Sequence, residues 1–196
     1  MMILEEILVY ENACPDAQEW AEGKTIEECV EQCHRGDWLL WLAERIGVDR
    51  RKLILAKAHC ANTVRHLMKD KRSKKAVDIA IAYGEGKATK DELMLAARHA
   101  DDAYTDGFFA RHNHAAAAAF LTVANATAYL NDAGRFADAV ASSTADAIAD
   151  QELFKAGVHG DKDACLINRL LTADICRKYI GQEIIDKVNR ILKQKS

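Results

Sequence analysis

Proline and glycine are scarce in this chain, whose 196 residues include one proline and ten glycines. Proline breaks a helix and interior glycine weakens it, so their scarcity favours helices that run without interruption. The alternation of apolar and polar residues that is typical of strands is convincing only in the opening ILEEILVY. These absences argue against a sheet-based fold and predict an all-α protein.

Long apolar runs and a basic leader are also missing. No apolar run approaches the ~20 residues that a membrane-spanning helix needs. Glu5 and Glu6 stand where a secretory signal would carry basic residues. We therefore expect a cytoplasmic protein with no membrane contact. In that reducing compartment the cysteines should be free, buried thiols rather than disulfides. They are Cys14, Cys29, Cys33, Cys60, Cys165 and Cys176.

The sequence contains no motif that identifies a reaction. The cysteines include no C-x-x-C pair of the kind that structural zinc sites use. The segment ASSTAD lacks the G-x-S-x-G of serine hydrolases, and GEGK is too short for a phosphate-binding loop. We therefore expect a protein that is not an enzyme and that binds no cofactor and no metal.

One cluster of residues keeps an enzymatic alternative open. His99, Asp101 and Asp102 precede His112 and His114 in a region that we expect to be helical. Carboxylates beside histidines can bind a metal or transfer protons. Histidines two positions apart, however, do not share a helix face, and no H-E-x-x-H accompanies them. The alternative is a small helical enzyme or a metal- or ligand-binding protein, and the simpler reading is a solvated helix surface.

The helices are expected to number about eight to ten, with short links, in a single compact domain spanning residues 1–196. Thr25 with Glu28, and Thr89 with Glu92, have the spacing of capping boxes. Three further helix starts are predicted from single polar residues that can cap a helix. These are Asp37, Asp49 and Ser73.

The densest apolar segment is WLLWLAERI, which follows Asp37 and ends before Gly47. As a helix it is apolar nearly all round, and such a helix is usually enclosed by others. We therefore interpret Trp38 and Trp41 as core residues that contribute to folding. An anchor for a partner and a ligand pocket remain the alternatives for this helix.

Charge alternates along the chain although its net value is only −3. Residues 1–35 carry a net charge of −7, and residues 36–80 carry +6. The basic run from Arg50 to Lys75 has no interleaved aromatic residues and matches no DNA-binding module, so nucleic acid is not an expected partner. The acidic block predicts a surface that attracts a basic protein partner, with a solvated helix face as the alternative. Its residues are Glu19, Glu22, Glu27, Glu28 and Glu31.

Three segments of the first third of the chain, residues 13–20, 25–47 and 52–64, resemble the immunity-protein-five-like family of bacterial and phage genomes. The shared features are an Ala-Cys pair, a spaced tryptophan, a D-W-x-x-W-L helix and a following apolar helix. The resemblance implies an all-α protein that neutralises a toxin, or a phage-encoded relative. It brings no catalytic residue, and the matching positions carry over only as fold determinants. They are Cys14, Trp20, Asp37, Trp38 and Trp41.

The leading hypothesis from these observations is a protein that binds and inhibits a protein partner stoichiometrically. The partner would be a bacterial toxin or, for a phage-encoded chain, a host defence effector. A third reading is a homo-oligomer that associates through the alanine-rich helices between residues 115 and 149.

Overall fold

The computed structural model describes residues 4–106 and 162–194, together with five isolated helical residues. All regular structure in this part of the chain is helical, which confirms the predicted all-α class. No helix among these residues is long and apolar enough to cross a membrane. The five isolated residues are Ala117, Val140, Ser143, Thr144 and Ala147.

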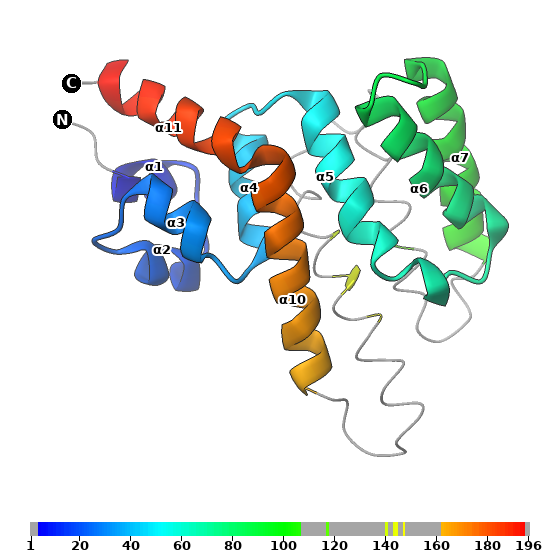
Figure 1. Ribbon diagram of the computed structural model, residues 1–196, viewed down its shortest axis with the longest axis horizontal. Helices are drawn as coiled ribbons and strands as arrows, with labels where there is room; N and C mark the ends of the chain where they lie inside the picture. Colours follow the sequence, from blue (N-terminus) through cyan, green and yellow to red (C-terminus); the bar gives the residue numbers. More distant parts are fainter. Residues whose placement is uncertain are drawn as a thin grey trace.

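The helices form two groups joined by a central pair (Figure 1). α1, α2 and α3 gather beside the two chain ends, and α5, α6 and α7 lie side by side at the other end of the molecule. α4 and α10 lie between these groups, and α11 runs from α10 past α3. The bounds are α1 (Leu4–Tyr10), α2 (Pro15–Ala21), α3 (Ile26–Gln32), α4 (Gly36–Arg45), α5 (Arg50–Asn62), α6 (Lys71–Gly84), α7 (Lys90–Asp106), α10 (Lys162–Cys176) and α11 (Gln182–Gln194).

The first group begins with a correction, because the opening segment is the helix α1 and not an alternating strand. Leu4, Ile7 and Leu8 are buried, at a spacing that puts them on one helix face. α2 begins at Pro15, where a missing N–H costs a helix nothing. α3 begins with the predicted capping box, in which the Thr25 hydroxyl accepts from the Glu28 N–H at 3.2 Å.

Two of the three predicted single-residue caps are wrong. α4 begins at Gly36, so Asp37 lies inside its first turn, where it is held by Arg35. α6 begins at Lys71 after Asp70, whose carboxylate accepts from the Arg72 N–H at 2.7 Å. Ser73 lies in the first turn of α6, fully buried, and its hydroxyl has no hydrogen-bond partner. The basic residues around it, from Lys71 to Lys75, therefore lie in the first turns of α6.

Other local predictions are confirmed. Asp49 caps α5 by accepting from the N–H groups of Arg51 and Lys52, at 3.0 and 3.1 Å. Thr89 and Glu92 form the second capping box at the start of α7. Gly47 follows the end of α4 with φ of +71°, a conformation that glycine adopts without strain.

α10 and α11 are not separated by a loop. A π-helical turn, η3 (Arg177–Gly181), connects them, so the chain bends without leaving the helical conformation. The apolar residues of α11 form a stripe along one side of the helix, in which Ile184 and Val188 are fully buried. The remaining stripe residues are partly buried against the same core, and they are Ile185, Ile191 and Leu192.

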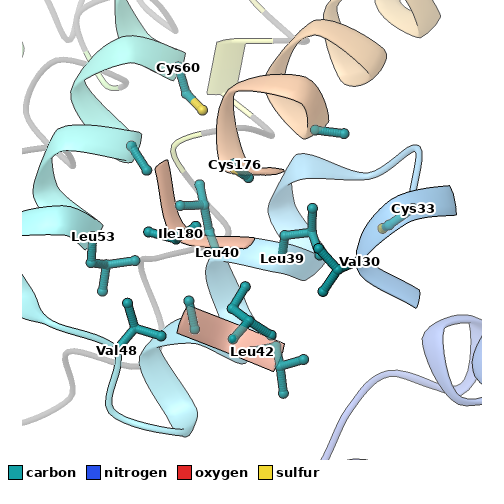
Figure 2. Packing of buried hydrophobic residues seen from close by; sticks show 14 of the residues in the cluster. Val30, Cys33, Leu39, Leu40, Leu42, Val48, Leu53, Cys60, Cys176 and Ile180 are labelled. Carbon is teal, nitrogen blue, oxygen red and sulfur yellow. The ribbon is translucent and has the colours of Figure 1, made fainter. Parts of the chain in front are cut away.

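The main hydrophobic core is built around α4 (Figure 2). Leu40 is fully buried and faces Ile180 of η3, with Leu53 and Cys60 of α5 lining the other side. Leu39 and Leu42 continue the buried part of α4 towards α3. The prediction that α4 is a core helix is therefore confirmed. A second cluster joins α5, α6 and α7, mostly through alanines.

The two tryptophans of α4 depart from the prediction that they are enclosed. Trp38 and Trp41 are only partly buried and pack against the core from its edge. The residues sealed from solvent on this helix are the aliphatic ones, Leu39, Leu40, Leu42 and Ala43. α4 therefore combines a buried aliphatic face with a half-exposed aromatic face.

α4 and α10 approach closely at Gly36. A Cβ atom added to Gly36 would lie 2.6 Å from the hydroxyl oxygen of Thr172 and 2.7 Å from its backbone carbonyl carbon. The Cys176 thiol, one turn further along α10, donates to the Gly36 carbonyl at 3.6 Å. Only glycine permits this contact without moving the backbone of α10.

We expect Gly36→Ala to lower the free energy of unfolding by about 1–3 kcal/mol, the usual result of overpacking a tight contact. Urea denaturation measures this loss. Gln32→Ala, at the exposed end of α3, is the control and should leave the midpoint almost unchanged. A Gly36→Ala protein as stable as the parent would contradict the close approach.

The corrected start of α6 is tested by a pair of alanine substitutions. Asp70→Ala removes the cap and should lower the free energy of unfolding by about 1 kcal/mol. Ser73→Ala removes a buried hydroxyl without a partner, so stability should stay within about 0.5 kcal/mol or rise. Chemical denaturation of both variants under one condition gives the comparison. The opposite ranking would restore Ser73 as the cap.

Candidate partner-binding surface

The five glutamates of the acidic block are all exposed, on the two neighbouring helices α2 and α3 and the turn after α2. α3 turns Ile26, Cys29 and Val30 into the core, which leaves its glutamates on the opposite side. On α2, Ala21 is the buried residue. The exposed glutamates are Glu19, Glu22, Glu27, Glu28 and Glu31.

Two of these glutamates are engaged in holding the fold. The Glu28 carboxylate accepts from the N–H and hydroxyl of Thr25, at 2.8 and 3.0 Å, and these hydrogen bonds lower the pKa of Glu28. The Glu27 carboxylate accepts from the Asn189 amide of α11 at 2.7 Å. The carboxylates of Glu19, Glu22 and Glu31 have no partner among the described residues, so they are available to a binding partner.

An apolar crevice opens between the helices that carry these glutamates. The free space inside it is only about 40 Å³. Pockets for drug-sized ligands are larger, about 300–1,000 Å³, so this crevice suits an inserted side chain better than a cofactor. Its walls come from α1, α2, α3, α4 and the residue after α3: Leu4, Leu8, Ala17, Trp20, Ala21, Ile26, Cys29, Cys33, Trp38, Leu39, Trp41 and Leu42.

Aromatic rings form one edge of the crevice. The ring centroids of Trp20 and Trp38 lie 5.9 Å apart, and His34 lies 6.2 and 6.0 Å from them. Such tilted contacts are favourable arrangements for aromatic rings. Because the rings are held against one another from three segments, they have little rotamer freedom to lose when a partner binds.

Cations cover the outer faces of the same indoles. The Lys24 ammonium lies 4.8 Å from the ring centroid of Trp20, and the Arg35 guanidinium lies 4.8 Å from that of Trp38. Arg45 lies 5.9 Å from the ring of Trp41. The crevice is therefore apolar at its floor, with aromatic rings and cations at its edge and carboxylates further out.

Arg35 connects this edge to the core. Its guanidinium grips the nearly buried Asp37 carboxylate through two hydrogen bonds of 2.8 and 2.5 Å, which raise the pKa of Arg35. Arg177 of η3 reaches across to donate to the Cys33 carbonyl at 2.6 Å. These two arginines fix the short link between α3 and α4, and with it the position of Trp38.

The cysteines near the crevice are ordinary buried thiols. Burial raises the pKa of both Cys29 and Cys33 to about 11, so both are protonated at neutral pH. A neutral thiol is a poor metal ligand and a poor nucleophile. The described cysteines are free, and no group of three or more potential ligands for a metal ion occurs in this part of the chain.

The described residues add no support to the alternative that this protein is an enzyme or a metal-binding protein. His99, Asp101 and Asp102 are exposed on α7, and none of them lines either of the two pockets described among these residues. His112 and His114 lie outside the described residues, as do most of the alanine-rich segments proposed for oligomerisation.

Much of the basic run is occupied within the fold. Arg65 pairs with Asp78 at 2.8 Å, and Arg72 pairs with Asp70 and Asp106, each at 2.7 Å. Lys57 of this run is fully buried and contacts the Glu44 carboxylate at 3.2 Å. Charge counted along the sequence therefore overstates the positive surface that this region presents.

Sequence reasoning missed the crevice and its aromatic edge. Trp20, His34 and Trp38 meet only after α2 and α4 fold together, and no local spacing reports such contacts. The sequence does contain one indication of the crevice. The α4 segment is apolar nearly all round, and its apolar surface is too wide to be covered by a single contact with the core. Comparison of this chain with family models, with curated proteins and with solved structures finds no match.

The capping role of Glu28 generates a test. In the folded protein the pKa of Glu28 is lowered from its ordinary value of 4.5. The ionised carboxylate therefore stabilises the fold fully above pH 4.5, and this stabilisation is lost as the pH falls through the lowered pKa. Glu28→Ala should therefore be less stable than the parent at pH 7, and the difference should shrink below about pH 4. Denaturation at both pH values measures this.

Glu31→Ala is the matched control, because Glu31 lies one turn further along the same exposed face and caps nothing. It should match the parent at pH 7. Equal effects of the two substitutions would show that Glu28 acts only as a surface charge.

Proposed function

We propose that this protein binds another protein and inhibits it stoichiometrically. The observation that carries the proposal is the apolar crevice with half-exposed tryptophans, which opens between two helices bearing unpaired carboxylates. A basic protein whose surface presents one apolar side chain beside lysines or arginines fits both features.

The tryptophans at the crevice and the carboxylates around it have different roles in the proposed binding. Buried aromatic anchors in apolar pockets carry much of the energy of protein interfaces, and tryptophan is prominent among them. Carboxylates around such a pocket attract a basic partner from a distance and orient it before contact. Trp20 and Trp38 are suited to the first role, and Glu19, Glu22 and Glu31 to the second.

The resemblance to the immunity-protein-five-like family supports the class of partner. We propose a cytoplasmic immunity protein whose target is a toxin with a basic active cleft. For a phage-encoded chain the target is a host defence effector with the same surface chemistry. An inhibitor of either kind needs no catalytic residue, cofactor or metal, because occupancy of the target suffices.

The test titrates the purified protein against the toxin or defence effector encoded beside its gene. Effector activity should fall linearly and vanish near one equivalent. E19K/E31K, which reverses one free carboxylate on each acidic helix, should slow association by about tenfold or more at low salt and flatten its salt dependence. Stopped-flow kinetics measure the rate at several salt concentrations.

D101K/D102K is the matched control, because it makes the same change in net charge on the exposed surface of α7. It should associate much faster than E19K/E31K. Inhibition that needs a large excess, or equal slowing by both double variants, would rule out stoichiometric binding through the acidic helices.

A further inference from the structure

A second pocket lies far from the acidic helices, at the end of the molecule formed by α5, α6 and α7. We propose that this pocket, lined by Arg50, Tyr83, Lys90 and Leu93, binds a small oxyanion of the phosphate class. Its volume is about 130 Å³. An engineered cavity of about 150 Å³ accommodates benzene, so this one has room for a phosphate group.

The cations of this pocket are not neutralised by the protein. Arg50 and Lys90 are exposed, and neither forms an ion pair or a side-chain hydrogen bond with any described residue. Arg51, the neighbour of Arg50, stacks on Tyr83 with its guanidinium 4.3 Å from the ring centroid. Arg51 donates to the Tyr83 carbonyl at 2.8 Å and contacts no carboxylate among these residues. Two unneutralised cations therefore line the pocket, and the Arg51 guanidinium lies on the ring of Tyr83.

Tyr83 is the buried aromatic residue in the lining of the pocket. The residue is 8% exposed, and its hydroxyl forms no hydrogen bond with any described residue. Tyr83 lines the pocket together with Arg50 and Lys90, and these residue types offer one neutral donor and two charged ones, the combination that binds oxyanions.

The fold brings the two cations of the pocket to one end of the molecule. Arg50 is the first residue of α5 and Lys90 is the first residue of α7, helices of 13 and 17 residues. Both helices begin, and α6 ends, at the same end of the three-helix array (Figure 1). Both N-termini carry a capping carboxylate, so the side chains of Arg50 and Lys90, and not the helix ends, supply the positive charge of the pocket.

The nearby carboxylates do not fill the site. Asp49 is turned towards the N–H groups of Arg51 and Lys52, and Glu92 towards the N–H and hydroxyl of Thr89. Asp91 is exposed and does not line the pocket. Because the caps use these acids, the positive side chains of the pocket stay available to an anion.

The test is a titration of the full-length protein with inorganic phosphate at constant ionic strength, followed by amide chemical shifts. Saturable shifts around Arg50 and Lys90 are expected, with a dissociation constant on the order of 1 mM. Arg50→Gln and Lys90→Gln should each weaken binding about tenfold. Tyr83→Phe should weaken it by a smaller factor, because it removes one neutral donor and keeps the ring.

Lys75→Gln is the matched control, since it removes one charge from the exposed surface of α6 outside the pocket. It should bind phosphate like the parent. A parallel titration with adenosine 5′-monophosphate identifies the source of the ligand. Tighter binding than inorganic phosphate assigns the site to a nucleotide phosphate, and equal or weaker binding assigns it to a free oxyanion. Non-saturable shifts that chloride reproduces, or an equal loss in Lys75→Gln, would overturn the proposal.

Discussion

The contact between α4 and α10 is the constraint on which the rest of the structure depends. At Gly36 the two backbones approach so closely that the side chain of Thr172 occupies the space of a Cβ atom. This approach places Leu40 against Ile180 and allows α5 to close the other side of the core. Polar ties secure the same region. Asn168 of α10 accepts from Thr144 at 2.8 Å and donates to Thr63 at 3.1 Å.

Because its aliphatic side chains already fill the core, α4 has no further buried volume for its tryptophans. Trp38 and Trp41 therefore lie at the edge, where α1, α2 and α3 cover them incompletely and leave the crevice. An aromatic edge held by a rigid core is a suitable anchor, since fixed rings lose little conformational entropy on binding. The same helix thus determines the fold and supports the proposed interface, and this explains why one sequence pattern suggested both.

Local signals account for what could be predicted from the sequence. Both capping boxes and the Asp49 cap depend on residues within one helical turn, and their spacing is enough. The caps assigned to Asp37 and Ser73 failed because several polar residues compete within one turn, and tertiary packing selects among them. Ser73 is buried by that packing. The burial of Lys57 against Glu44 and the bond between Glu27 and Asn189 join segments distant in the sequence, so no spacing rule could indicate them.

Contacts between segments distant in the sequence also decide which charged side chains are paired and which remain free on the surface. Arg65 and Arg72 of the basic run pair with acids of α6 and α7. Arg50 and Lys90, each at the start of a helix, have no ion-pair partner among the described residues. On α2 and α3, a single lysine accompanies the acids, and most of their charge cannot be neutralised locally. Among the described residues, the acidic helices thus lie at one end and the cations of the second pocket at the other. For the proposed basic partner, this distribution of charge would favour approach to the acidic helices over the cationic end. The proposed interface would then combine the position of the tryptophans and the distribution of charge in one binding geometry.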